Sequence, residues 1–143
     1  MQLSTRGRYA SRLIIQVALN QHNGAVPKKK IAAETDVTPD YMEQLLVKLK
    51  HNGLVRSQRG IKGGFLLAQP ATAITLRQVL EAVGERLELA PCLVKDEHCK
   101  YEETCTMKKV WQKATNQLRD YFEGITVAEL CESRELGIEP ATS

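Results

Sequence analysis

The segment 38–68 limits the choice of fold more than any other part of the chain. Thr38-Pro39 combines a helix-capping residue with a proline that suits the first helical position. The residues that follow have one apolar face until Gly53, which suits a left-handed helix stop. Two short apolar segments then flank the glycine-rich residues 60–64, a pattern that predicts a β-hairpin. We therefore expect a helix at 39–52 followed directly by a hairpin.

Two further helices are expected before this segment. Apolar residues at helical spacing within residues 9–18 predict an amphipathic helix that ends near Gly24. A second, short helix is expected at 28–35, joined to the helix at 39–52 by a tight Asp36-Val37 connection. This pair has the pattern of a helix-turn-helix, with a generic helix hairpin as the alternative. The β-hairpin that follows favours a winged helix-turn-helix.

Basic side chains are concentrated in the first half of the chain. Residues 1–68 contain 11 Lys and Arg against four Asp and Glu, whereas residues 69–143 contain nine against 13. A basic surface is what binding to DNA phosphates requires, and a solvated charged face is the alternative interpretation. Arg59 and Lys62 lie at the tip of the predicted wing, from which cations can reach phosphates or a narrow minor groove.

The second half predicts a short helix, a loop and a long helix. Thr75 caps a helix that ends before Gly84, and Thr126 begins a capping box for a short terminal helix. Between them a long apolar stripe is formed by Met107, Val110, Trp111, Ala114, Leu118, Tyr121 and Phe122. A second copy of the chain is the simplest cover for such a stripe, with packing on the first helix as the alternative. We therefore expect a homodimer.

The expected fold class is mainly α: a winged helix-turn-helix with a small β-hairpin wing and a long C-terminal dimerisation helix. Residues 1–84 form the winged-helix DNA-binding domain, whose first helix also packs in the dimer. Residues 85–106 form a cysteine-rich loop, and 107–133 form the dimerisation helix and the short terminal helix. Residues 134–143 contain few apolar groups and are expected to be a disordered tail.

The sequence predicts a cytoplasmic protein without membrane contact. No stretch approaches the roughly 20 apolar residues of a membrane span. Arg6, Arg8 and Arg12 interrupt the apolar residues near the N-terminus, and no cleavage-site pattern follows them. In the reducing cytoplasm, four cysteines indicate metal or redox chemistry more often than structural disulfides.

Three of the cysteines, Cys92, Cys99 and Cys105, lie in one loop. Their spacing is wider than that of paired zinc ligands, whereas soft thiolates suit an iron–sulfur cluster, which usually takes four ligands. The fourth ligand is left open among a group from a partner subunit and four loop residues, His98, Glu97, Glu102 and Glu103. Cys131, on the terminal helix, is interpreted as an ordinary small apolar side chain.

Together these segments resemble the IscR-like iron–sulfur cluster regulators of the Rrf-two family of bacterial winged-helix transcription factors. The resemblance extends over nearly the whole chain, and its most specific parts are YMEQLL at 41–46, NGLV at 52–55, RGIKGGFLL at 59–67 and the three-cysteine loop. It implies a homodimeric regulator, expected to be a repressor, that binds an operator in double-stranded DNA. It also implies that Cys92, Cys99 and Cys105 bind a [2Fe–2S] cluster, or in some relatives a [4Fe–4S] cluster.

The resemblance further implies how the protein meets DNA. The helix at 39–52 would enter the major groove with Glu43 and Gln44 on base edges, and Arg59 would enter the minor groove. The complete set of predicted DNA contacts is Lys28, Lys29, Lys30, Pro39, Tyr41, Glu43, Gln44, Lys48, Arg59 and Lys62. The lysines in this set are expected to neutralise phosphates.

Two positions differ from the family pattern for the fourth cluster ligand. IscR-like members have a histidine three residues beyond the last cysteine, where this chain has Lys108. Another branch of the family uses an acidic residue on the first helix of the partner, where this chain has Arg8. The first gap between cysteines is also one residue longer than in these relatives.

Other classes of protein are less consistent with the sequence. No nucleophile with a base partner and no paired carboxylates are apparent, so an enzyme is not expected. Sensing by thiol oxidation or by zinc is the main alternative to a cluster. An iron–sulfur or electron carrier is a further alternative, and salt-dependent binding to random DNA would exclude it.

Overall fold

The computed structural model describes residues 2–95 and 97–136 of the chain. It confirms a mainly helical winged helix-turn-helix. The helices and strands are α1 (Thr5–Asn20), α2 (Lys28–Thr35), α3 (Pro39–His51), β1 (Val55–Gln58), β2 (Gly64–Leu67), α4 (Leu76–Ala82), α5 (Thr106–Glu123) and α6 (Val127–Leu136). Short 3₁₀ turns are η1 (Gln21–Asn23), η2 (Ala71–Ala73) and η3 (Pro91–Leu93).

Helix α1 lies at the centre of the body, in contact with α2, α3, α4 and α6. The Ser4 hydroxyl caps its first turn by accepting a hydrogen bond from the Gly7 amide at 3.3 Å. Leu13, Ile14 and Val17 are fully buried on its inner faces, and each such side chain contributes about 1.5–3 kcal/mol to folding. After η1 the chain turns at Gly24, where a helix end was expected.

Helices α2 and α3 form the predicted helix-turn-helix. Asp36 adopts a left-handed conformation with φ of 55° between them, and Val37 is buried beneath the turn. The inner face of α3 is formed by Met42, Leu45, Leu46 and Leu49, all of which are buried. Thr38 occupies the expected cap position, but its side chain makes no capping hydrogen bond, so Pro39 and the acidic Asp40 in the first turn favour the helix start.

The wing consists of two antiparallel strands, β1 and β2, paired from Val55–Leu67 to Gln58–Gly64. A third short segment joins it, because Val26 pairs with Phe65 through amide–carbonyl hydrogen bonds of 2.8 and 2.9 Å. The sequence did not reveal this bridge, since the two residues between Gly24 and Pro27 are too few to show strand periodicity. The bridge fixes the wing to the segment that precedes α2.

Helices α4 and α6 begin side by side. Thr75 forms a capping box with Gln78, and Thr126 forms one with Glu129, as expected. The two helix starts are joined by 2.8 Å hydrogen bonds from the Leu76 amide to the Ile125 carbonyl and from the Val127 amide to the Ile74 carbonyl. Helix α6 continues to Leu136, so the first residues of the predicted tail are helical. The rest of that tail lies outside the described residues.

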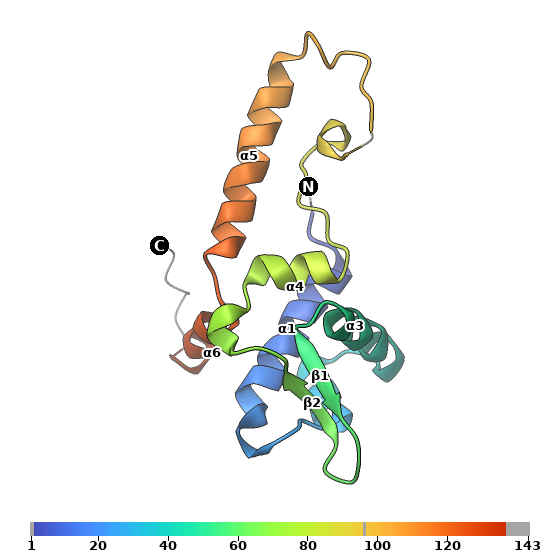
Figure 1. Ribbon diagram of the computed structural model, residues 1–143, viewed down its shortest axis with the longest axis vertical. Coiled ribbons are helices and arrows are strands. Elements are labelled where there is room, and N and C mark those ends of the chain that lie inside the picture. Colours follow the sequence, from blue (N-terminus) through green and yellow to red (C-terminus); the bar gives the residue numbers. More distant parts are fainter. Residues whose placement is uncertain (1, 96, 137–143) are drawn as a thin grey trace.

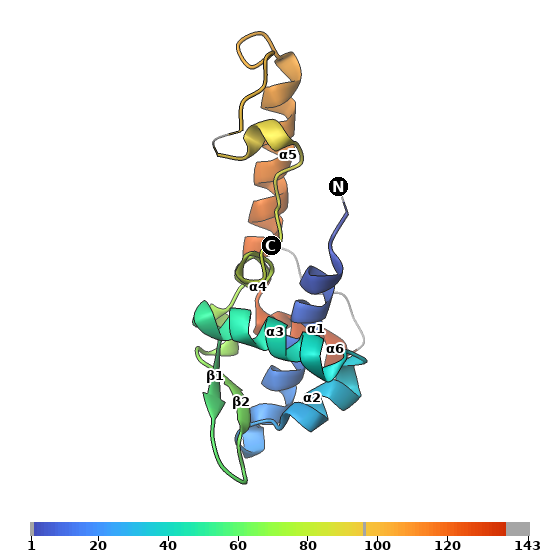
Figure 2. The same ribbon diagram turned by 90° about the vertical axis from the view of Figure 1, so that its right-hand side faces the viewer.

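Helix α5 projects from the body, and the chain between α4 and η3 runs outward beside it before α5 leads back (Figure 1). Figure 2 shows that the wing and the far end of α5 lie at opposite ends of the molecule. The chain between α4 and the loop is attached to α5 by the Leu89 amide, which donates to the Thr115 hydroxyl at 3.2 Å, and by an ion pair between Glu88 and Arg119. No helix in the described part of the chain has both the length and the apolar character needed to cross a membrane.

Candidate nucleic-acid interface

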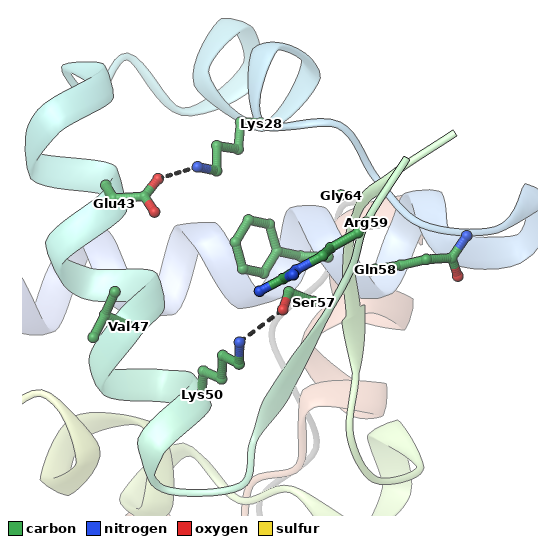
Figure 3. A pocket seen from close by; sticks show the side chains of 9 residues that line it. Lys28, Glu43, Val47, Lys50, Ser57, Gln58, Arg59 and Gly64 are labelled. Atoms are coloured by element: carbon green, nitrogen blue, oxygen red, sulfur yellow. Dashed lines mark hydrogen bonds and ion pairs between the residues drawn. The ribbon is translucent and has the colours of Figure 1, made fainter. Parts of the chain in front are cut away.

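A groove separates the outer face of α3 from the wing (Figure 3). Its walls come from the start of α2, from α3 and from both strands of the wing. The side chains that line it are Lys28, Glu43, Val47, Lys50, Ser57, Gln58, Arg59, Gly64 and Phe65. Three of these residues are cationic and one is acidic, so the groove is suited to an anionic ligand.

Two internal contacts hold charged side chains across this groove. Lys28 on α2 forms an ion pair with Glu43 on α3, and Lys50 donates a 2.7 Å hydrogen bond to the Ser57 hydroxyl on β1. Both pairs are exposed and contribute little to stability. Their effect is to orient the side chains. The Glu43 carboxylate is held against a cationic partner, and the Lys50 side chain joins α3 to the wing.

The other residues predicted to contact DNA lie on the same elements as the residues that line the groove. Gln44 and Lys48 are exposed on the outer face of α3, and Lys29 and Lys30 are exposed on the first turn of α2. Pro39 is also exposed, and Lys62 lies in the turn at the wing tip. Of the predicted set, the structure brings Lys28, Glu43 and Arg59 together along one groove, and the others lie on the same three elements.

Tyr41 lies in the first turn of α3. It is half-buried, and its ring meets that of Tyr9 edge-on, with 5.9 Å between the ring centroids. The predicted set did not include six residues that line the groove, Val47, Lys50, Ser57, Gln58, Gly64 and Phe65. The helical period of α3 places Val47 outside its apolar face. The sequence could therefore have indicated an exposed aliphatic residue on the outer face of this helix.

The three loop cysteines lie beyond α4 and at the start of α5. Cys92 is in η3, Cys99 is in the following irregular segment, and Cys105 directly precedes α5. All three are half-buried free thiols. Within residues 2–95 and 97–136, no three side chains of His, Cys, Asp or Glu converge as a metal site. The loop therefore supplies soft ligands for a cluster, but not a preformed arrangement of them.

Lys108 occupies the position at which a fourth ligand was considered. Its hydrogen bond to the Glu102 carboxylate raises the pKa of the Lys108 ammonium, and the nearby sulfur atoms of Cys92 and Cys99 raise it further. The same contact lowers the pKa of Glu102. A protonated ammonium has no lone pair to offer a metal. In this structure Lys108 is thus a protonated partner of Glu102.

Cys131 is separate from this loop. It packs against the edge of the hydrophobic core, and its sulfur lies 4.0 Å from the Ile15 carbonyl oxygen. Burial raises the pKa of the Cys131 thiol, with Glu135 adding to the effect. This environment is consistent with the interpretation of Cys131 as a small apolar side chain.

A helix-turn-helix, a wing and one basic face between them define a winged-helix DNA-binding protein. The chain belongs to the Rrf2 family, described as iron-dependent transcriptional regulators, whose family model matches residues 3–133. The HTH-type transcriptional regulator IscR of Erwinia tasmaniensis is 38% identical over 136 residues, which cover 95% of this chain and 82% of that protein. IscR of Klebsiella pneumoniae is 35% identical and is covered to 83%. The chain is therefore a transcriptional regulator and not an enzyme.

Solved structures of the same family have the same fold. T. potens IscR matches with a TM-score of 0.77 and 26% identity over 100% of this chain and 94% of that chain. CymR, the global cysteine regulator of B. subtilis, matches with a TM-score of 0.75 and 25% identity over 92% and 97%. The oxidised form of Staphylococcus aureus CymR matches with a TM-score of 0.72 and 31% identity over 92% and 97%.

Proposed function

We propose that two copies of the chain bind a pseudo-palindromic operator, with one α3 helix in each of two successive major grooves. The observation that carries this proposal is the gathering of exposed cationic and polar side chains from α2, α3 and the wing on one face. Gln44 would meet base edges, and Arg59 would reach the minor groove. The regulator would act in the cytoplasm, as a repressor.

The lysines would neutralise phosphates on either side of α3. Lys28 is held toward the groove by Glu43, so its ammonium is oriented before DNA arrives. Lys29, Lys30 and Lys48 are exposed and are free to approach the backbone. Their contribution depends on counterion release and so falls as the salt concentration rises.

Replacing Arg59 by alanine tests the wing. Loss of a guanidinium contact in the minor groove is expected to weaken operator binding by about 1–3 kcal/mol, which is roughly five- to 150-fold. The measurement is a gel shift on a duplex selected from random DNA. Arg77→Ala is the matched control, because Arg77 pairs with Glu81 on α4 and does not line the groove. Equal affinities of Arg59→Ala and the wild type would contradict the role of the wing.

The proposed dimer is supported by the exposed apolar stripe on α5. Met107, Val110 and Tyr121 are 44%, 48% and 49% exposed, and Trp111 is 39% exposed. Large apolar side chains gathered on a projecting helix are typical of a protein interface. A symmetric contact between two α5 helices would cover them and would place the two basic faces on one duplex.

For sensing, we propose that Cys92, Cys99 and Cys105 are the responsive groups. When bound, an iron–sulfur cluster of the [2Fe–2S] or [4Fe–4S] type would join these sulfur atoms. The presence of this link would depend on the supply of iron and on the oxidation state. Cys105 directly precedes α5, and η3, which contains Cys92, contacts α5. Drawing the thiols together would therefore act on the proposed dimer helix. Thiol oxidation and zinc are the alternatives, and a solved oxidised form of CymR favours the former.

Iron and acid-labile sulfide, measured on protein purified without oxygen, test the cluster. We expect about two of each per chain for a [2Fe–2S] form, with visible absorption that Cys99→Ala loses. Cys131→Ala is the control and should keep the absorption, because Cys131 packs against the core away from the loop. Colourless, iron-free protein that still binds DNA would contradict the cluster and leave thiol chemistry or zinc as the signal.

A further inference from the structure

The outer face of α3 presents an aliphatic side chain at its centre. Val47 is 56% exposed and lines the groove beside the wing. Among the described residues of the four helices α1, α2, α3 and α4, it is the only exposed large hydrophobic side chain, and Ile61 in the turn of the wing is the other one in this half of the chain. Single exposed apolar residues are common on protein surfaces. Val47 is informative because it lies on α3, the helix proposed to enter the major groove.

The neighbours of Val47 on this face already have partners. Glu43, one turn earlier, is paired with Lys28, and Lys50, about one turn later, donates to Ser57 at 2.7 Å. Figure 3 shows Val47 on α3 between these two contacts. The middle of α3 therefore presents the two methyl groups of Val47 to a base edge. The polar side chains on either side are held by contacts with α2 and the wing.

The major groove contains one kind of apolar group, the C5-methyl of a pyrimidine. In unmodified DNA this group belongs to thymine, and apolar side chains contact it directly. A β-branched valine in a helix has one strongly preferred rotamer, so little side-chain freedom would be lost on contact. Valine has no hydrogen-bonding group and can distinguish bases only through such an apolar contact.

We propose that Val47 selects a thymine in each operator half-site by contact with its C5-methyl group. The proposal rests on the proposed insertion of α3 into the major groove. It assigns Val47 a role in specificity that is separate from the hydrogen-bonding role proposed for Gln44. The same contact would accept 5-methylcytosine, which carries an identical methyl group.

Removing single methyl groups from the DNA tests this assignment. In a duplex selected by the purified protein from unmodified random DNA, each thymine is replaced in turn by deoxyuridine. One thymine per half-site is expected to stand out, and its replacement should weaken wild-type binding about fourfold, the factor for burying one methylene-sized group. Comparing the affinities for cytosine and 5-methylcytosine at that position measures the effect of the methyl group apart from the rest of the thymine base.

The protein side of the test uses Val47→Ala, which removes both methyl groups from an exposed position and leaves the core intact. In this variant the deoxyuridine effect should shrink to less than twofold, which measures the coupling between the two groups. A flat thymine scan, or an equal loss in both proteins, overturns the assignment. If Arg59→Ala still weakens binding, only Val47 is misassigned; if it does not, the proposed role of the wing fails as well.

Discussion

Replacing Trp111 by glutamate is expected to convert the protein to a monomer and to weaken operator binding about a hundredfold or more. Linking two DNA-binding heads raises affinity by about 10²–10⁴ over one head, because the second contact becomes intramolecular. Trp111 lies on the exposed stripe of α5, and a tryptophan buried at an interface is a common energetic hot spot. A carboxylate buried there would have no partner.

Analytical ultracentrifugation and gel shifts on one-half-site and two-half-site duplexes measure this effect. The variant should bind both duplexes with similar affinity, whereas the wild type should prefer the longer one. Asn116→Glu is the matched control, since Asn116 is exposed on α5 and lies about half a turn away from the apolar stripe. A Trp111→Glu protein that sediments as a dimer would contradict the proposed interface.

The second large effect is expected for Gly64→Ala at the start of β2. Gly64 has φ of 152°, and an added Cβ would lie 2.1 Å from the Val26 carbonyl oxygen and 2.4 Å from its carbon. The backbone of the Val26 segment must move, which breaks the 2.8 and 2.9 Å bonds between Val26 and Phe65. We expect the free energy of unfolding to fall by about 2–4 kcal/mol, and operator affinity to fall as the wing loses its anchor.

Urea titration and the operator gel shift report the two consequences of this change. Gly24→Ala is the control, because Gly24 has a positive φ of 107° but nothing within 4 Å of an added Cβ. That variant suffers backbone strain alone, of about 1–3 kcal/mol, and leaves the hydrogen bonds of Val26 to the wing intact, so its operator affinity should not change. If both alanine variants lose the same stability, the close approach of Gly64 to Val26 does not hold the wing.

Local patterns were sufficient to predict most of the elements. The short helix at 28–35 was predicted with the bounds that α2 has, and α3 begins at Pro39 as expected. Proline at the first helical position, glycine at a left-handed stop and capping boxes act over a few residues. Such signals need no knowledge of the rest of the fold, and Gly53 with φ of 73° illustrates this.

Contacts between distant segments could not be predicted in this way. The Val26–Phe65 bridge joins residues that share no periodic pattern, and the pairing of Lys28 with Glu43 depends on the angle between two helices. Glu43 was expected on a base edge, yet its carboxylate has an internal cationic partner. The roles of Cys92, Cys99 and Cys105 as cluster ligands stay predictions from the family resemblance.

By itself, the sequence determined the helices, the wing, the basic first half and the cysteine-rich loop. Periodicity, capping and charge are properties of neighbouring residues, and they are therefore present in the chain before it folds. Only the tertiary structure decided which charges have partners, how deeply each thiol is buried and which apolar groups are left exposed. These depend on the packing of segments that are far apart in the chain. Val47 on α3 and the stripe on α5 are exposed for that reason, as no other described segment of the chain covers them.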